Sequence, residues 1–295
     1  MIPLFAELCA GTAALSLRLQ SAYARPPVSR MGNKQGYARA ILRCLGLRSG
    51  SGAARYVWCE PDPGTRLLLT SFTDADLRAK AAAIIRGWKD EDPRALWERL
   101  KAEGPVKAPP FDPREVARWI RIMTSNRLIN LGPDWKNTGQ GGSTFGGDEF
   151  CTPIPTLLQA LHEITDHPAV IVPDARGLQV DQLPAGSVAY IDPPYLGHLG
   201  LEPTTGYGHA LTRAEVCELA ERWAAAGARV VISESAPLVE LSGWHTVEIT
   251  GERIGQKRTF SRQKREWLTM NTPPVWRPPV QRTLWTMNTN QPEAT

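Results

Sequence analysis

The stretch GSVAYIDPPY, residues 186–195, decides the fold and locates a candidate site. Its apolar first half is typical of a buried strand. Pro193 and Pro194 end that strand, because neither has an N–H to donate and both hold φ at about −65°. Asp192 and Tyr195 therefore lie in a stiff turn at the carboxyl end of a strand. In open α/β sheets, ligands bind in the crevice beyond such ends.

Length, charge and cysteine content narrow the class of protein. The 295 residues suffice for one large domain, or for a domain that carries a sizeable insertion. The formal charge of +4 permits a polyanionic partner without requiring one. The five cysteines form no CxxC pair, which argues against a zinc site or a disulfide framework, so we expect no metal and reduced thiols. We also expect no signal peptide and no membrane span, and hence a cytoplasmic protein.

Strand and helix patterns alternate along the chain, as an α/β layer fold requires. Residues 2–17 begin as a short strand, turn and continue as a helix. The sequence predicts further strands at 56–59, 169–173, 187–191, 229–233, 244–249 and 260–271, and helices at 37–47, 74–100, 114–123, 156–164 and 212–226. The glycine-rich stretch 130–155 predicts a long loop or a small irregular lobe, and loops of that length in compact proteins are usually functional or disordered.

Three acidic residues end short apolar strands that should share one edge of the sheet. They are Glu7, Glu60 and Asp174. Any one of them alone is as well explained as a solvated loop residue. Gly11, in the turn after the first strand, lets backbone amides approach a ligand. An acid at the end of the second strand is the position from which α/β nucleotide binders reach a ribose. The coincidence of all three favours a ligand that contains a nucleoside.

These segments together resemble one family, the Dam-type DNA adenine methyltransferases, which use S-adenosyl-L-methionine and carry a DPPY signature. The signature is intact here as residues 192–195. Residues 205–235 are similar to the family's segment after that signature, residues 264–271 to its last strand, and residues 30–45 to its basic, glycine-containing segment. The likeness covers roughly residues 2–72 and 165–271.

The resemblance implies a fold and a domain organisation. We expect a Rossmann-like methyltransferase sheet with helices on both faces, formed by residues 1–73 and 165–271. Residues 74–164 would form an inserted, mainly helical and loop lobe for target recognition, and residues 272–295 a proline-containing tail. The cofactor would contact ten residues: Glu7, Cys9, Ala10, Gly11, Met31, Gly32, Lys34, Glu60, Asp174 and Asp192.

The chain departs from the family pattern in two places. Ala13 stands where most members have a second glycine, so that we expect its methyl group to fit beside the cofactor. The basic segment RMGNK, residues 30–34, follows the first strand and helix, whereas in the family it usually precedes them. This second departure bears on the role of Lys34 more than on that of Asp192.

The chemistry of an adenine amino group accounts for the four residues of the signature. This nitrogen is a poor nucleophile, because its lone pair is delocalised into the ring. The Asp192 carboxylate and a carbonyl near Pro193 can accept its two N–H protons and localise the lone pair. Tyr195 can stack on the base, a contact worth about 1–3 kcal/mol. A base inside a duplex cannot reach such a pocket, so it must be flipped out. Catalysis of the in-line transfer would then depend on orientation.

Polar and basic residues outside the strands are candidates for contact with DNA. The predicted contacts are Arg30, Arg127, Trp135, Lys136, Asn137, Gln140, Ser143 and Tyr207, which offer phosphate, base-edge and stacking interactions. Arg114, Arg118 and Arg121 place positive charge on neighbouring turns of a predicted helix, where a solvated basic face is an equally good interpretation.

The sequence therefore predicts a site-specific methyltransferase that modifies the N6 amino group of a flipped-out adenine in double-stranded DNA. The alternatives are the same chemistry on cytosine N4 or on adenine in RNA, and a catalytically inert DNA-binding relative. The resemblance also implies a prokaryotic or phage-infected cell, and a restriction endonuclease as a possible partner that the sequence does not reveal. We expect a monomer or weak dimer.

Overall fold

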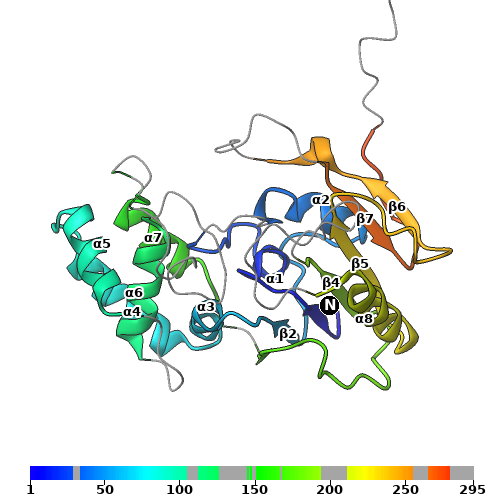
Figure 1. The fold of residues 1–295 in the computed structure, drawn as a ribbon, viewed down its shortest axis with the longest axis horizontal. Helices are drawn as coiled ribbons and strands as arrows, with labels where there is room; N and C mark the ends of the chain where they lie inside the picture. Colours follow the sequence, from blue (N-terminus) through cyan, green and yellow to red (C-terminus); the bar gives the residue numbers. More distant parts are fainter. Residues whose placement is uncertain are drawn as a thin grey trace, which may run out of the picture.

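The protein forms a seven-stranded, mostly parallel sheet flanked by helices, compatible with a Rossmann-like fold (Figure 1). The computed structural model describes residues 1–28, 34–104, 112–125, 145, 147, 151–166, 168–193, 211–254 and 265–279. The strands lie in the order β3-β2-β1-β4-β5-β7-β6. Their bounds are β1 Phe5–Glu7, β2 Tyr56–Cys59, β3 Ala169–Val172, β4 Val188–Ile191, β5 Arg229–Glu234, β6 His245–Glu248 and β7 Trp267–Met270.

The strand order places a reversal point between β1 and β4. From β1 the chain builds outward through β2 to β3, and it then returns to β4 on the other side of β1. β5 pairs parallel with β4, whereas β7 runs antiparallel to both β5 and β6. In doubly wound sheets the crevice at such a reversal is where ligands bind. The carboxyl ends of β1 and β4 are therefore the first place to look for a site.

Helices cover both faces of the sheet. Their bounds are α1 Ala14–Gln20, α2 Ala38–Cys44, α3 Pro63–Thr73, α4 Ala75–Gly87, α5 Pro93–Ala102, α6 Pro113–Met123, α7 Ile154–His162 and α8 Arg213–Ala225. Alternate strand residues face opposite sides. Phe5, Trp58 and Tyr190 pack in one core cluster with α1, α2 and α3, while Ala6 and Ile191 pack in another with α8. The expectation of helices on both faces is confirmed.

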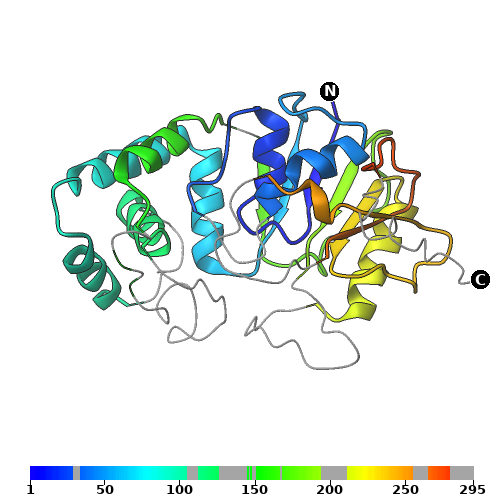
Figure 2. The same cartoon turned by 90° about the horizontal axis from the view of Figure 1, so that it is seen from above.

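Four helices between β2 and β3 gather beside the sheet as a group. In Figures 1 and 2, α4, α5, α6 and α7 lie at one end of the molecule, with α3 between them and the sheet. These helices belong to residues 74–164, where the sequence predicts an inserted lobe. The lobe's role in target recognition remains a prediction.

Local capping signals explain where these helices begin. Asp62, Asp92 and Asp112 each precede a proline, and each carboxylate accepts the backbone N–H three residues on. An Asp at the N-cap followed by Pro is a strong helix start. The cap at Asp92 divides the expected helix 74–100 into α4 and α5, and the cap at Asp62 begins α3, which the sequence analysis did not predict.

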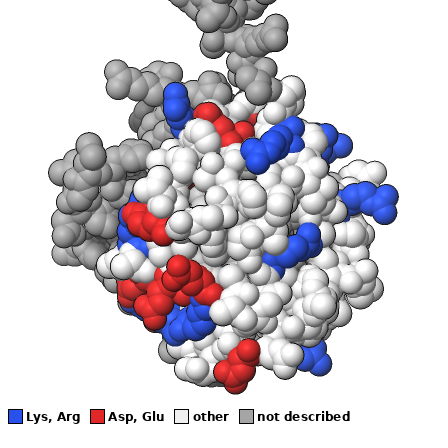
Figure 3. Space-filling model, turned by 90° about the vertical axis from the view of Figure 1, so that its right-hand side faces the viewer, with Lys and Arg blue, Asp and Glu red and all other residues white. Residues whose placement is uncertain are grey.

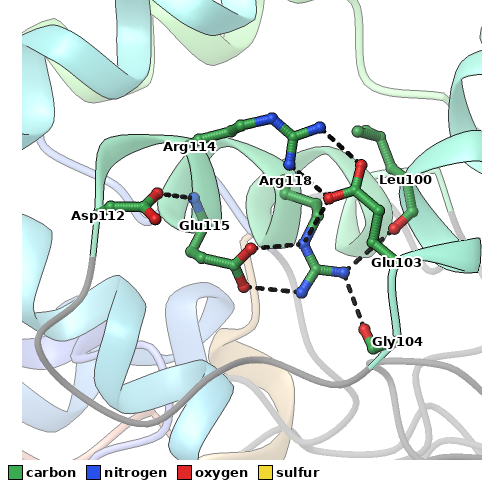
Figure 4. A network of polar contacts seen from close by, with 7 residues as sticks. All are labelled: Leu100, Glu103, Gly104, Asp112, Arg114, Glu115 and Arg118. Carbon is green, nitrogen blue, oxygen red and sulfur yellow. Dashed lines mark hydrogen bonds and ion pairs between the residues drawn. The ribbon is translucent and has the colours of Figure 1, made fainter.

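The basic helix expected at 114–123 is α6, and two of its arginines are buried. Arg118 is 1% exposed and Arg121 4% exposed. Figure 4 shows Arg118 directed at Glu115, with Nη2 to Oε2 at 2.8 Å, and at the carbonyls of Leu100 and Gly104. Arg121 donates to the Thr152 carbonyl. Neither of the two interpretations left open by the sequence, contact with DNA or a solvated basic face, holds for these two side chains, because their guanidinium groups are buried and bind the protein itself.

The third arginine, Arg114, is about half exposed and pairs with Glu103. Its charge is therefore already engaged within the helical group. In the part of the chain that the structure describes, no helix is both long and apolar enough to cross a membrane.

Candidate functional site

The strand register brings two acidic residues to the same level at the carboxyl edge of the sheet. In the last paired row of β1, Glu7 lies opposite Trp58 on β2 and Tyr190 on β4. Two residues beyond this row, β2 leads to Glu60 and β4 leads to Asp192. Both acids thus flank the turn that follows β1, at the reversal point of the sheet. The sequence predicts a shared edge for Glu7, Glu60 and Asp174. The strands that these acids end or precede, β1, β2 and β3, pair parallel, so all three lie at the carboxyl edge of the sheet, and Asp192 after β4 lies at the same edge.

Glu60 fixes the turn between β1 and α1. Its Oε2 accepts the Gly11 N–H at 2.8 Å and its Oε1 accepts the Asp62 N–H at 3.0 Å. The side chain is 5% exposed. Gly11 has φ +52°, which favours glycine, and a Cβ at this position would meet no atom within 4 Å. Gly11 therefore borders open space directly beside the acid that ends β2.

Glu7 is turned toward α1. Its Oε1 accepts the Ser16 N–H at 2.7 Å, and the residue is 2% exposed. Burial raises the pKa of the Glu7 carboxyl to about 7; the hydrogen bonds from Ser16 oppose this rise and the charge of Asp192 adds to it. Glu7 thus holds the start of the helix, and any effect on a ligand passes through the backbone that it fixes.

Ala13 adopts a backbone conformation that usually favours glycine. Its φ of 51° and ψ of 40° are left-handed. Among the described residues, Ala13 alone combines a positive φ with a side chain. Ala13 is fully buried and belongs to the core cluster that contains α1. The methyl group therefore packs in the core. The expectation that it fits beside the cofactor stays a prediction.

Lys34 reaches Asp192 despite a separation of 158 residues in sequence. Lys34 begins the 3₁₀ turn η1 (Lys34–Gly36), and its Nζ lies 2.6 Å from Asp192 Oδ1. The same Nζ lies 3.7 Å from Glu266 Oε1. Ser233, on β5, donates to that Glu266 oxygen at 2.6 Å. Lys34, the last residue of the basic segment, thus contacts the first residue of the DPPY sequence.

Cys9 lies between the two acids of this edge. Burial, followed by the charges of Asp192 and Glu60, raises the pKa of its thiol well above the ordinary value. The thiol therefore stays protonated at neutral pH, and a role as a nucleophile is disfavoured. The adjacent Ala10 is buried, and its N–H donates to the Cys59 carbonyl at 2.8 Å. Ala10 thus ties the turn after β1 to the end of β2.

Asp174 does not join this group through the contacts observed. It stands three residues beyond Ile171, which pairs with Trp58, and not two as Glu60 does beyond Trp58. It is half-exposed, and its carboxylate accepts from Arg176, which also pairs with Glu215 on α8. The structure therefore places Asp174 in a surface ion-pair network.

Several predicted site residues lie outside the described residues. These are Pro194, Tyr195, Arg30, Met31, Gly32, Arg127, Trp135, Lys136, Asn137, Gln140, Ser143 and Tyr207. Their proposed roles stay predictions. Pro193 is described and is buried.

Two site residues were missed by the sequence analysis, Glu266 and Ser233. Both belong to segments that were singled out as strands, but a strand pattern does not reveal which polar side chain faces a lysine far away in sequence. The side of the molecule shown in Figure 3 carries lysines and arginines interspersed with acids, and neither sign dominates its coloured residues.

A separate cavity of about 370 Å³ lies at the opposite, amino-terminal edge of the sheet. Pro3, Gly186 and Arg229 line it, and these residues precede or begin β1, β4 and β5. The acidic residues described above are at the other ends of the same strands, so this cavity does not belong to the candidate site.

Comparison with known proteins adds no family assignment. No protein-family model matches the chain, and no curated protein matches it at a significant level.

Proposed function

We propose that the protein transfers a methyl group from S-adenosyl-L-methionine to the exocyclic N6 amino group of an adenine in DNA. The observation that carries this proposal is the convergence of Glu60, Gly11, Asp192 and Lys34 at the reversal point of the sheet. A nucleoside ligand would bind beside Gly11, and Asp192 would face the group that is modified.

The charge of this edge supports a positively charged nucleoside over a phosphorylated one. In the described residues, Glu7, Glu60 and Asp192 lie at the carboxyl ends of neighbouring strands at this edge, and Asp192 and Glu266 lie within 4 Å of one ammonium group, that of Lys34. Phosphate groups would be repelled by such an excess of acid. S-adenosyl-L-methionine carries a sulfonium and an ammonium group, which suit it. When bound, it supplies an activated methyl group.

The residues present also fit the nucleoside part. Open space adjoins Gly11, and Glu60 stands at the end of β2, from which an acid can accept hydrogen bonds from a ribose. A carboxylate offers about four lone-pair positions, so that hydroxyl groups can add to or replace the backbone donors of Glu60. The antiparallel β7 and the helices on both faces are compatible with the methyltransferase sheet that the family resemblance implies.

Asp192 is the residue we assign to the reacting amino group. Its side chain is 18% exposed, so it is reachable from solvent, while the buried Pro193 holds the backbone behind it. An ionised carboxylate accepts an N–H proton in a hydrogen bond and thereby increases the electron density on the amino nitrogen. The proton that leaves with product formation passes to solvent or to Asp192.

Methyl transfer itself is the direct test. With radiolabelled S-adenosyl-L-methionine and adenine-containing duplex DNA, the intact protein should label DNA, and Asp192→Ala should reduce the rate at least about 10³-fold, since orientation and proton acceptance are lost together. Digestion to nucleosides should show the label on N6-methyladenine. Label on N4-methylcytosine, or activity only on RNA, would select one of the alternative substrates.

Cofactor binding separates catalysis from the inert alternative. Calorimetry should detect S-adenosyl-L-methionine binding to the intact protein and to Asp192→Ala with similar affinity. Glu60→Ala should weaken binding about 10- to 100-fold, the usual cost of losing charge-assisted hydrogen bonds. Exposed Glu98→Gln on α5 is the matched control and should bind as the intact protein does. No binding by the intact protein would refute the proposed function.

A further inference from the structure

We propose that Glu266 is a positioning residue that receives the Lys34 ammonium group when Asp192 binds its substrate. This inference rests on the proposed function, because it assigns the incoming amino group to Asp192. Lys34 would have two places for its ammonium group: on Asp192 in the empty site, and on Glu266 once Asp192 is occupied. Glu266 would then act on the reaction only through Lys34.

The distances fit an exchange between two carboxylates. Lys34 Nζ lies 2.6 Å from Asp192 Oδ1 and 3.7 Å from Glu266 Oε1, so a displacement of about 1 Å reaches hydrogen-bond distance to the second acid. A lysine ammonium on a four-carbon stem turns readily and has three donors. No movement of a helix or strand is needed.

Burial shows from which side each group is reached. Lys34 and Glu266 are each 3% exposed at the side chain, whereas Asp192 is 18% exposed. A ligand from solvent therefore meets Asp192 first, and the ammonium group can withdraw into the protein toward Glu266. A second acid in the interior favours this withdrawal, because a buried positive charge is stabilised by a carboxylate within hydrogen-bond reach.

Both ends of the exchange are held in place. The Glu266 N–H donates to Thr250 Oγ1, and its Oε1 accepts from the Ser233 hydroxyl. The segment that follows β6 also contacts η1: the Ile254 N–H donates to the Gly36 carbonyl at 2.9 Å. A Cβ on Gly36 would lie 3.0 Å from the Arg253 side chain, so this approach is close. Residues 250–254, which follow β6, thus contact both Glu266 and the turn that Lys34 begins.

The exchange has a consequence for substrate affinity. If Lys34 must leave Asp192 before substrate binds, the apparent affinity falls by the fraction of protein in which Asp192 is available. Glu266 raises that fraction because it stabilises the displaced ammonium group. Removal of its charge should therefore raise KM for DNA and leave kcat nearly unchanged once the substrate is bound.

A double-mutant cycle on thermal stability tests the exchange without any methyl transfer. Asp192→Asn leaves Lys34 paired with Glu266, and Glu266→Gln leaves it paired with Asp192. The double variant leaves a buried ammonium group without either carboxylate, so its loss in Tm should exceed the sum of the two single losses by about 5 °C. Asp192→Asn combined with Glu240→Gln is the control and should be additive, because Glu240 pairs with Arg213. Additive losses in the first cycle would overturn the proposal.

Steady-state kinetics supply the second measurement. Glu266→Gln should raise KM for adenine-containing DNA about 10-fold and change kcat less than about 3-fold. A loss in kcat at unchanged KM would overturn the proposal, since it would make Glu266 part of the chemical step. If the intact protein transfers no methyl group, the proposed function fails, and the stability cycle still decides whether Lys34 has two carboxylate partners.

Discussion

The helical group and the carboxyl edge of the sheet both bury charged side chains, but the balance of positive and negative groups around those charges differs. In the helical group, buried Arg118 meets Glu115 in a two-point contact and two backbone carbonyls accept its remaining donors. At the sheet edge, the buried ammonium group of Lys34 lies within 4 Å of two carboxylates, those of Asp192 and Glu266. The first arrangement is balanced, whereas the second has an excess of acid.

This difference separates a structural ion pair from a candidate binding site. A buried charge with a complete set of partners stabilises one geometry and has little left to offer a ligand. An edge with surplus acid, a carboxyl group of raised pKa and a left-handed alanine carries a cost in stability. Proteins keep such costs mainly at functional sites, so the imbalance itself favours the sheet edge as the site.

The largest effect on stability is expected in the balanced region. Glu115→Gln leaves the Arg118 guanidinium buried, with Glu103 at 3.8 Å as the nearest remaining acid in the described residues. Loss of one partner of a buried pair typically costs about 3–5 kcal/mol. Chemical denaturation should show this loss in the free energy of unfolding, and calorimetry should show unchanged affinity for S-adenosyl-L-methionine.

The neighbouring exposed pair is the matched comparison. Glu103 is 30% exposed and Arg114 47% exposed, so Glu103→Gln should cost at most about 1 kcal/mol, as surface pairs do. Equal losses for Glu115→Gln and Glu103→Gln would show that burial does not distinguish the two contacts. The contrast between the helical group and the sheet edge would then lose its basis.

Glu7 provides a pH-dependent test at the sheet edge. The folded-state pKa of about 7 exceeds the ordinary 4.5, so between these values the folded protein keeps a proton that the unfolded chain releases. The contribution of Glu7 to the free energy of unfolding is therefore fully present below pH 4.5 and falls as pH rises. Above pH 7 this contribution, about 3 kcal/mol, is lost. Glu7→Gln cannot titrate and should lack this fall.

The measurement is the free energy of unfolding of both proteins at pH 4.5 and pH 8 by denaturant titration. The stability of the intact protein relative to Glu7→Gln should drop by about 3 kcal/mol between the two conditions. Exposed Glu98→Gln controls for the removal of a surface charge. Parallel pH curves for the intact protein and Glu7→Gln would contradict the account of Glu7 as a buried carboxyl that favours its proton.

The sequence revealed the sheet better than it revealed the helical group. Short apolar runs that end at Glu60 and Asp192 mark strands and their carboxyl ends, because a parallel strand buried on both faces is a nearly continuous run of apolar residues. Expected and observed strands therefore agree closely, apart from the shorter β7. In α6 the spacing of Arg118 and Glu115 permits an ion pair, but whether that pair is buried depends on the helices packed around it, which local pattern does not report.

The candidate site was predictable in the parts that the strands carry. Parallel strands in one sheet have their carboxyl ends at the same edge, so Glu60 and Asp192 were expected to lie near each other there. The contact of Lys34 with Asp192 depends on how η1 returns to the sheet, and Glu266 reaches Lys34 through a strand inserted antiparallel between β5 and β6. Contacts of that range are set by tertiary packing, and only the family resemblance brought Lys34 to attention.

The smallest effect concerns the strained alanine of the sheet edge. Ala13→Gly relieves a left-handed conformation that costs about 1–2 kcal/mol for a residue with a Cβ. It also removes a buried methyl group, about 0.8 kcal/mol, and adds chain entropy to the unfolded state, about 0.4–1 kcal/mol. These terms nearly cancel, so we expect a change in the free energy of unfolding within about 1 kcal/mol.

Ala14→Gly is the comparison that isolates the backbone term. Ala14 is the next residue, also buried, and it begins α1 in a helical conformation, so glycine there relieves nothing. Its substitution should cost about 2 kcal/mol, from lost helix propensity and the lost methyl group. A gap of at least about 1 kcal/mol between the two variants measures the strain held at Ala13. Equal losses would mean that the turn after β1 relaxes without cost, and that the sheet edge is no more strained than the helical group.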